Sequence, residues 1–293
     1  MPKVTVLLPT FNRQDLIVET IKSVFTQTYS DYEVLVVDDG STDDTEHVLK
    51  PWKSKISYIK KTNGGPSSSR NVGISRITSD YVAFLDSDDQ WEPNFLERVV
   101  SVLESRPALG LVTTSRLMVP EGVCQPRIPK AHVEGDLYPL LFQRNFVTTS
   151  GTLVKRECFN TVGLFNEDLI QAGDYDMWLR ISKAYPIAFL KEPLCRYRCH
   201  ISNISRNELR HQLFLQQVLD ANYDPKRIPE QDWRFRRSRA WISLGCAYQT
   251  LEKNALARQC FRKALDLTPT RVKLWRHFLG TWLKPNRPPG AGK

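Results

Sequence analysis

Short apolar runs alternate with amphipathic stretches along the first hundred residues. Each apolar run is closed by a turn or a breaker residue, which predicts buried strands at 3–9, 32–37, 56–60 and 81–85. Between these runs the apolar spacing is that of a helix face, which predicts helices at 13–27, 43–50, 66–75 and 93–103. Ser41 and Asp44 form the expected capping box of the second helix. Such alternation predicts a parallel sheet with helices on both faces, an α/β fold.

The chain is less regular after residue 105. Residues 107–154 mix prolines with short strands, a helix is expected at 174–184, and two further strands are expected at 187–190 and 193–199. From about residue 207 onward the pattern is that of helices only. We therefore expect a mixed sheet flanked by helices, followed by an all-α extension.

The helical part contains a repeat signature. Eight positions match the tetratricopeptide pattern in order, namely Trp241, Leu244, Gly245, Tyr248, Ala257, Phe261, Ala264 and Pro269. Trp275 follows Trp241 by one repeat length, and a last helix at about 270–284 carries an aromatic stripe with basic flanks. That stripe fits either a membrane interface or packing on the preceding repeat. Because so few repeats rarely stand alone, we expect them to pack on another body.

These patterns give a domain plan. We expect an α/β domain over 1–205, made of a regular half (1–105) and a less regular half (106–205). A helical extension over 206–285 and a flexible tail over 286–293 would follow.

Composition narrows the class of protein. Of the 293 residues, 41% are apolar and 25% charged, which excludes disordered, collagen-like and disulfide-knot chains. No run approaches the roughly 18–20 apolar residues that span a bilayer, and the N-terminal apolar stretch is too short for a signal peptide. Six sparse cysteines indicate reduced thiols, so we expect a cytoplasmic location.

The net charge of +9 conceals an asymmetry. Residues 191–293 hold 21 basic and 8 acidic residues, a net charge of +13, whereas residues 1–190 carry a net charge of −4. The basic third is either a solvated helical surface or a surface for an anionic membrane, a phosphorylated substrate or a protein partner. Nucleic acid is not an expected partner, because neither zinc-finger spacing nor the signature of an RNA-binding sheet is present.

The polar loops at 10–13, 38–42 and 86–89 follow strand ends, which is where open α/β sheets bind ligands. Their motifs resemble the family 2 glycosyltransferases, which share the A-type glycosyltransferase fold (GT-A). The resemblance covers roughly residues 3–205 and is specific because its motifs occur together in family order. The matching segments are Val4 to Asn12, Val36 to Asp43, Asn63 to Asn71, Phe84 to Asp89, Gly163 to Glu167, Gly173 to Arg180 and Tyr197 to His200.

The resemblance implies that 1–205 is a catalytic domain, with a nucleotide-sugar-binding half (1–105) and an acceptor half (106–205). It implies a nucleoside-diphosphate sugar, with uridine as the expected nucleoside. Asp39 would accept a hydrogen bond from the base, with Thr10 and Phe11 framing it, and Arg70 could reach the diphosphate or the base. Gly64 would mainly serve a backbone turn. The expected nucleotide-sugar site comprises Pro9, Thr10, Phe11, Asn12, Arg13, Asp39, Asn63, Gly64, Arg70, Asp86 and Ser87.

Two carboxylates at one strand end, Asp86 and Asp88, suit Mg²⁺ or Mn²⁺, which prefer hard oxygen ligands and bind substrate phosphates. We assign Asp88 to the metal, and Asp86 to the ribose or to a metal-bound water. His200 matches a residue that completes the metal shell in some relatives, although a structural role fits it equally well.

Asp174 is the expected general base, which would take the proton of the acceptor hydroxyl in an inverting displacement. A helix-capping role is compatible with the same position. Relatives usually carry Glu-Asp here, and Gly173 replaces that Glu. Asp176 is expected to pair with Arg180 at helical spacing.

The sequence thus predicts an inverting, metal-dependent glycosyltransferase acting on a carbohydrate or lipid-linked acceptor in glycan or cell-envelope polysaccharide synthesis. Its basic extension would dock a protein partner, a second subunit or the anionic inner membrane face. Two alternatives stay open. One is an inactive glycosyltransferase-like scaffold, which Gly173 favours, and the other is a nucleotidyltransferase, which the Asp174 motif disfavours.

Overall fold

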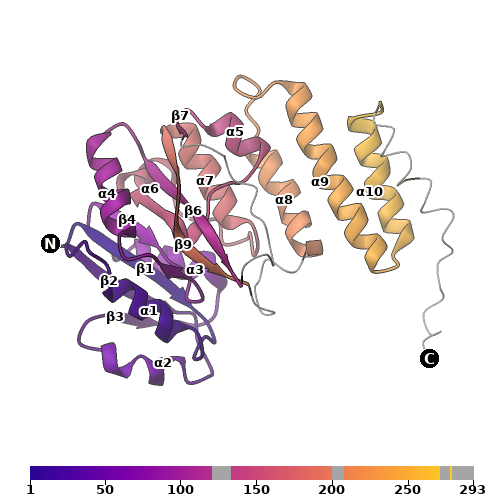
Figure 1. Cartoon of the computed structure of the whole chain (residues 1–293). Coiled ribbons are helices and arrows are strands. Elements are labelled where there is room, and N and C mark those ends of the chain that lie inside the picture. Colours follow the sequence, from indigo (N-terminus) through magenta and orange to yellow (C-terminus); the bar gives the residue numbers. More distant parts are fainter. Residues whose placement is uncertain (121–132, 200–207, 271–277, 279–293) are drawn as a thin grey trace, which may run out of the picture. The chain divides into compact units, whose positions relative to one another are not determined.

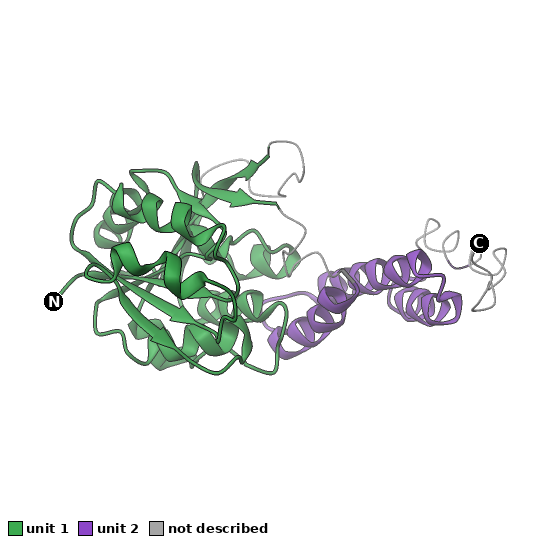
Figure 2. Cartoon of the chain, turned by 90° about the horizontal axis from the view of Figure 1, so that it is seen from below, with its two compact units in different colours: residues 1–201 green, residues 202–293 purple. Residues whose placement is uncertain are grey.

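The computed structural model describes residues 1–120, 133–199, 208–270 and 278. The chain divides into two compact units, residues 1–201 and 202–293, which Figure 2 draws in different colours. Each unit is described by itself. The last expected helix and the tail lie almost entirely outside the described residues.

In its described part, the first unit is built on a nine-stranded sheet (Figure 1). Four parallel strands form one side in the order β3 (Ser57–Lys60), β2 (Tyr32–Asp38), β1 (Val4–Thr10) and β4 (Tyr81–Phe84). β8 (Thr152–Lys155) pairs antiparallel with β4 and continues the sheet. The expected α/β fold is confirmed.

β1 shows why this half of the sheet is apolar throughout. Val4, Val6 and Leu8 join a core that includes Ile17 and Ile21 of α1 (Ile17–Phe25) and several residues of α4 (Phe95–Ser105). On the other face Leu7 lies against Gly73 of α3 (Gly65–Ile74), so closely that a Cβ on Gly73 would sit 2.2 Å from a Leu7 methyl group. Alternate residues of one strand therefore serve two separate helix layers.

The rest of the sheet is mixed. β6 (Leu111–Val119) pairs antiparallel with β8 and parallel with β9 (Ile187–Arg198), and β9 also pairs with β5 (Gln90–Trp91) and β7 (Val133–Gly135). The two strands expected at 187–190 and 193–199 are one strand. Register shifts on either side of Ser115 let β9 follow β6 across the intervening residues without breaking the ladder.

Two helix starts differ from expectation. α1 begins at Ile17 rather than at residue 13, because residues 13–16 form a turn in which the Arg13 carbonyl accepts the N–H groups of Leu16 and Ile17 (3.0 Å each). The N–H groups of Arg13 and Gln14 are bound by Thr45 (2.9 Å) and Asp43 (3.2 Å). The Ser41–Asp44 capping box is wrong. Asp43 accepts the N–H of Thr45 (3.0 Å), while the Ser41 hydroxyl accepts the N–H of Asn12 (2.9 Å). The second helix is consequently only one turn, α2 (Thr45–Val48), followed by the 3-10 turn η1 (Lys50–Trp52).

Four short helical elements and one longer helix complete the described part of the first unit. Phe84 of β4 packs edge-on against Phe159 of α6 and Trp178 of α7, at ring-centroid distances of 6.2 and 5.6 Å. The elements are α5 (Tyr138–Gln143), η2 (Thr149–Gly151), α6 (Glu157–Val162), α7 (Gly173–Ala184) and, before them, η1.

The described part of the second unit holds α8 (Glu208–Asn222), α9 (Glu230–Thr250) and α10 (Asn254–Leu267). Phe261 of α10 is fully buried and lies against Gly245 of α9, where a Cβ would come within 2.6 Å of the ring. The small and aromatic positions of the repeat signature thus meet at one helix–helix contact. None of the helices in the described ranges has both the length and the apolar character needed to cross a bilayer.

Candidate active site

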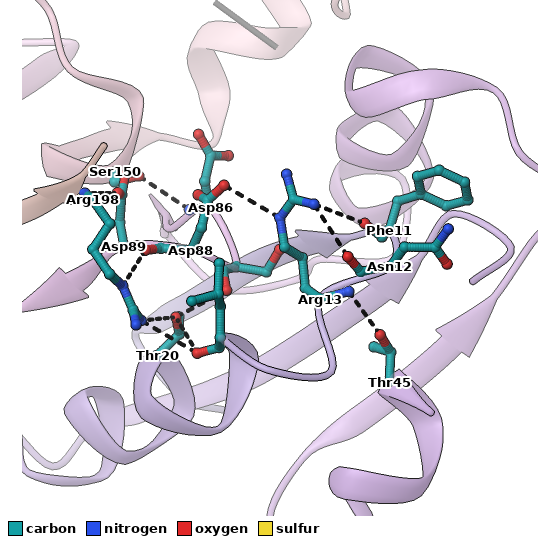
Figure 3. A network of polar contacts seen from close by, with 12 residues as sticks. Phe11, Asn12, Arg13, Thr20, Thr45, Asp86, Asp88, Asp89, Ser150 and Arg198 are labelled. Carbon is teal, nitrogen blue, oxygen red and sulfur yellow. Dashed lines mark hydrogen bonds and ion pairs between the residues drawn. The ribbon is translucent and has the colours of Figure 1, made fainter. Parts of the chain in front are cut away.

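The polar loops that follow β1, β2 and β4 meet at one edge of the sheet. These three strands are parallel neighbours, so their carboxyl ends lie side by side. The N–H of Asp39 donates to the Thr10 carbonyl (2.8 Å), so the loops after β1 and β2 are bonded to each other. Figure 3 shows the side chains from the first loop and from the acidic loop after β4 facing one another.

Each acid of the Asp86-x-Asp88 pair has an arginine partner. Arg70 of α3 donates from Nη2 to Asp86 Oδ1 (2.6 Å), and Arg13 donates from Nε to Asp88 Oδ2 (3.3 Å; Figure 3). The side chain of Arg70 is 7% exposed, so its pair with Asp86 is shielded from solvent on that side. Burial raises the pKa of Asp86 above its ordinary value, Arg70 opposes this, and the charges of Asp88 and Asp174 add to it.

Asp89 is the buried acid of the loop and has a different role. Its Oδ2 accepts the Ser150 hydroxyl (2.5 Å) and its Oδ1 accepts the N–H of Arg198 (3.0 Å). Burial, and then the charges of Asp88 and Asp86, raise the pKa of Asp89 well above its ordinary value. Asp89 therefore fixes the backbone that presents its two neighbours.

Arg198, at the end of β9, ties the acidic loop to α1. Its Nε donates to the Asp88 carbonyl (2.5 Å), its Nη1 pairs with Glu19 (2.7 Å) and its Nη2 reaches the Leu16 carbonyl (3.3 Å; Figure 3). Ser87 is buried in the same loop, and its carbonyl accepts the Thr20 hydroxyl (3.0 Å). The loop is thus bound from both sides.

Asp39 organises the loop before α3. Its carboxylate accepts Lys61 Nζ (2.7 Å) and the N–H groups of Gly64 (3.0 Å) and Gly65 (2.7 Å). The Asn63 amide donates to the Asp39 carbonyl (3.1 Å). Three of the expected nucleotide-sugar residues, Asp39, Asn63 and Gly64, are therefore in direct contact. A carboxylate offers about four acceptor positions, so one stays available on Oδ2 beside the bond from Gly65.

The first loop leaves β1 through Pro9 and Thr10, both buried, and exposes Phe11, which is 41% accessible. The Thr10 hydroxyl oxygen is buried and makes no hydrogen bond with any described residue. Asn12 has a φ of 51° and accepts the N–H of Thr42 (2.9 Å) through its side chain. Its positive φ turns the chain so that Arg13 faces the acidic loop.

Asp174 lies in the first turn of α7. Its Oδ2 accepts the hydroxyl of Thr149 in η2 (3.1 Å), and its charge contributes to the raised pKa of Asp86, so these carboxylates interact. Asp176 pairs with Arg180 at 2.9 Å, as expected. Gly173 has no room for a side chain without movement, because a Cβ would sit 2.7 Å from the Ser67 hydroxyl oxygen of α3.

Asn71 of α3 holds the loop that precedes α7. Its amide donates to the Phe165 carbonyl (2.9 Å) and to Glu167 (2.7 Å), and its oxygen accepts the N–H of Phe165 (2.9 Å). Helix α3 therefore contacts the acidic loop through Arg70 and the α7 loop through Asn71.

His200, the third expected metal ligand, lies outside the described residues. Among the residues that the structure describes, no group of three or more His, Cys, Asp or Glu side chains is arranged around a common point. Asp86 and Asp88 nevertheless fit a divalent cation, because Mg²⁺ and Mn²⁺ are commonly held by one or two carboxylates together with substrate phosphates and water. The five cysteines in the described ranges are free thiols.

Sequence reasoning missed four residues that hold the site together: Lys61, Thr149, Ser150 and Arg198. Arg198 stands in a family motif, Tyr197 to His200, which is a usable signal. Thr149 and Ser150 lie in the irregular stretch 107–154, where no periodicity points to them. Their role depends on contacts across the fold.

Comparison with known proteins shows the family of this chain. The family model described as "Glycosyl transferase family 2" matches residues 5–153, and a tetratricopeptide repeat model matches residues 238–271. An uncharacterized glycosyltransferase of Rickettsia felis is 31% identical over 72% of this chain, and the chain spans only 36% of that relative's length.

Two relatives carry names from cell-envelope polysaccharide synthesis. The putative teichuronic acid biosynthesis glycosyltransferase TuaG of Bacillus subtilis is 29% identical over 71% of this chain and 83% of its own length. The putative colanic acid biosynthesis glycosyl transferase WcaA of Escherichia coli is 31% identical, over 63% of this chain and 67% of its own length.

Two solved structures share the fold. Staphylococcus aureus TarS, residues 1–349 with UDP-GlcNAc, has a TM-score of 0.69 and 19% identity, and the match covers 94% of this chain and 91% of that one. The mannosyltransferase PcManGT from Pyrobaculum calidifontis, solved with GDP-Man and Mn²⁺, has a TM-score of 0.62 and 20% identity, covering 97% and 86%. At these identities the likeness is one of fold.

Proposed function

This chain belongs to glycosyl transferase family 2, and on that basis we propose that it is an inverting enzyme. It would transfer a sugar from a UDP-linked donor to an acceptor hydroxyl. The observation that carries the proposal is the link between Asp174 and the acidic loop. Two consecutive residues of η2 join them, because Thr149 bonds to Asp174 while Ser150 bonds to Asp89 and to the N–H of Asp86. The charge of Asp174 also adds to the raised pKa of Asp86. A base on one side and metal-binding acids on the other are what a direct displacement at the anomeric carbon requires.

Asp88, with Asp86, would hold Mg²⁺ or Mn²⁺. Bound there, the ion would neutralise the negative charge that develops on the leaving nucleoside diphosphate. Arg13 and Arg70 already supply positive charge to these two carboxylates. The Mn²⁺ complex of PcManGT supports this assignment at the level of the shared fold.

The nucleotide would lie over the loops after β1 and β2. Asp39 keeps one acceptor position for the N–H of a uracil ring, and Lys61 and the 64–65 backbone fix the orientation of its carboxylate. Phe11, in the first loop, offers an exposed ring. Arg70 is held at the acidic loop by its bond to Asp86, so its positive charge would lie near the diphosphate. The UDP-GlcNAc complex of TarS supports a uridine donor.

Asp174 would accept the proton of the acceptor hydroxyl. Thr149 and the N–H of Tyr175 hold its two oxygens, at 3.1 and 2.8 Å, which orients the carboxylate without a second acid beside it in the sequence. The acceptor is proposed to be a carbohydrate or lipid-linked glycan, in keeping with the names of TuaG and WcaA.

The domain plan and the location are proposals of the same kind. The catalytic domain would comprise residues 1–205 and the helical extension residues 206–285. We propose a cytoplasmic enzyme whose basic extension contacts an anionic membrane face, because residues 191–293 carry a net charge of +13.

The test is a titration of UDP with and without Mn²⁺, together with a hydrolysis screen of UDP-sugars that measures released UDP. We expect UDP to bind more tightly with Mn²⁺, and the variants Asp88→Ala and Asp174→Asn to lose about 10²–10⁴ in rate while keeping the wild-type circular dichroism spectrum. UDP affinity should fall in Asp88→Ala and stay unchanged in Asp174→Asn.

Other outcomes point elsewhere. Binding of UDP that ignores Mn²⁺, with no UDP released from any donor, would indicate a scaffold rather than an enzyme. Release of pyrophosphate would indicate nucleotidyl transfer. Near-normal turnover by Asp174→Asn would remove that residue as the base.

A further inference from the structure

The 3-10 turn η2 lies between the acidic loop and the candidate base. Thr149 and Ser150 are consecutive and buried, with exposed fractions of 7% and 1%. Thr149 donates its hydroxyl to Asp174 (3.1 Å). Ser150 donates its hydroxyl to Asp89 (2.5 Å) and accepts the N–H of Asp86 through the same oxygen (3.1 Å; Figure 3). One dipeptide thus contacts both halves of the site.

The turn itself is rigidly placed. The Ser150 carbonyl accepts the indole N–H of Trp91, a ring that is buried and stacked on Phe95 at 4.3 Å. Gly151 has no space for a Cβ, which would sit 2.9 Å from the Thr114 hydroxyl oxygen of β6. The N–H of Gly151 donates to the Thr148 carbonyl (2.9 Å), and this bond closes the turn. Packing on three sides leaves η2 little freedom to shift.

We propose that Thr149 and Ser150 are positioning residues that set the separation between the general base and the acidic loop. This inference rests on the proposed function, since it takes Asp174 as the base. Thr149 holds Oδ2 of Asp174 and leaves further acceptor capacity on the carboxylate for the substrate hydroxyl. Ser150 holds the loop at both Asp86 and Asp89, so the rigid turn fixes the acidic loop relative to Asp174.

The two residues should give different kinetic signatures. Thr149→Val keeps the shape and removes the donor, so the rate of UDP release at saturating donor should fall by about 10-fold or more, with the Kd of UDP in Mn²⁺ within about 2-fold of the wild type. Thr149→Ser restores the hydroxyl and should return to within about 3-fold of the wild-type rate. Ser150→Ala should weaken UDP binding and reduce the rate, because it loosens the acidic loop.

Thr152→Val is the matched control. Thr152 is a fully buried threonine three residues along, and its hydroxyl bonds to the Thr148 carbonyl (2.7 Å) and to Thr113 (3.0 Å) without touching an acid of the site. Its variant should lose thermal stability and keep the wild-type rate. The donor in every assay is the UDP-sugar that the wild type hydrolyses fastest. If Thr149→Val does not fold, Thr149→Ala removes the same hydroxyl and carries the same expectation.

Three results would overturn the proposal: a Thr149→Val rate within 3-fold of the wild type, a Thr149→Ser rate as low as that of Thr149→Val, or an equal rate loss in Thr152→Val. Asp174→Asn separates this failure from failure of the proposed function. If Asp174→Asn is inactive and Thr149→Val is normal, only the positioning role is lost. If Asp174→Asn turns over normally, the base assignment itself is wrong.

Discussion

Asp38 and Asp39 are neighbours at the end of one strand, yet they have different partners. Asp38 is fully buried, accepts the N–H of Ser41 (2.7 Å) and accepts the hydroxyl of Tyr58 from β3. Asp39 turns to Lys61 and to the loop before α3. Because successive side chains of a strand point to opposite faces, one carboxylate secures the sheet and the other faces the ligand loops.

This division predicts the effect of Tyr58→Phe. Removing the phenolic hydroxyl leaves the buried Asp38 carboxylate without one of its donors, so the free energy of unfolding should fall by about 1.5–3 kcal/mol at pH 7. Burial, and then the hydrogen bond to Asp38, raise the pKa of Tyr58 above its ordinary value. Above pH about 10 Tyr58 ionises in the unfolded chain but not in the folded one, so the unfolding free energy of the wild type falls. The difference in unfolding free energy between the wild type and Tyr58→Phe should therefore become smaller. Urea unfolding at several pH values measures both.

Tyr32→Phe is the matched control, because Tyr32 donates its hydroxyl to a neutral partner, the Val24 carbonyl (2.9 Å). It should cost only about 0.5–1.5 kcal/mol. Equal losses in the two variants would show that the charge of Asp38 plays no part.

Among the elements, α9 and α10 pack closely against each other. Gly245 of α9 lies under the Phe261 ring, Lys263 covers the Trp241 ring at 4.3 Å, and the Ser238 hydroxyl donates to the Ala264 carbonyl (3.1 Å). Arg234 adds hydrogen bonds to the last carbonyls of α10, at 3.0 and 3.1 Å. The contact combines a small residue that permits approach with polar bonds that satisfy a helix end.

Gly245→Ala should therefore destabilise this helix pair. Alanine favours a helix by about 0.8–1 kcal/mol, whereas forcing a methyl group against the ring typically costs about 1–3 kcal/mol, so a net loss is expected. Hydrogen exchange of peptides from α9 and α10 measures it without interference from the first unit.

A double-mutant cycle supplies the control for Gly245→Ala. Phe261→Leu removes the ring edge that the new methyl group would meet. The double variant should therefore lose less unfolding free energy than the two single variants lose in sum. Strict additivity would contradict the close contact as the cause.

At the scale of the whole molecule, every described residue of the candidate site belongs to the first unit, residues 1–201. The basic surplus lies in the last third of the chain. A chain that ends at residue 201 should therefore bind UDP in Mn²⁺ with a Kd within about 3-fold of the full chain, because it keeps every contact of the site that is described above. Isothermal titration calorimetry measures this.

The same pair of chains tests the proposed membrane contact. Sedimentation with anionic vesicles should retain the full chain and release it at high salt, because exposed charges are screened, while the shortened chain stays in solution. Loss of UDP binding by a shortened chain with an intact circular dichroism spectrum would contradict the first expectation. Equal sedimentation of both chains would contradict the second.

The order of elements over residues 1–105 follows from the apolar pattern of the sequence alone. Strands buried on both faces are continuous apolar runs, and the loops after them carry polar motifs at fixed places, so β1, β2 and β4 and the residues Asp39, Asp86 and Asp88 could be found by pattern. The repeat pattern of α9 and α10 was readable for the same reason, since small and aromatic residues recur at a set spacing.

The side chains that hold these motifs in place could be identified only from the folded structure. Thr149, Ser150 and Arg198 contact residues 25 to 182 positions away, and the Ser41–Asp44 box fails because the Ser41 hydroxyl is bonded to Asn12 in another loop. Local propensity extends only a few residues along the chain. A hydrogen bond between distant segments exists only once packing has brought them together, so the supporting contacts of a site cannot be derived from local pattern alone.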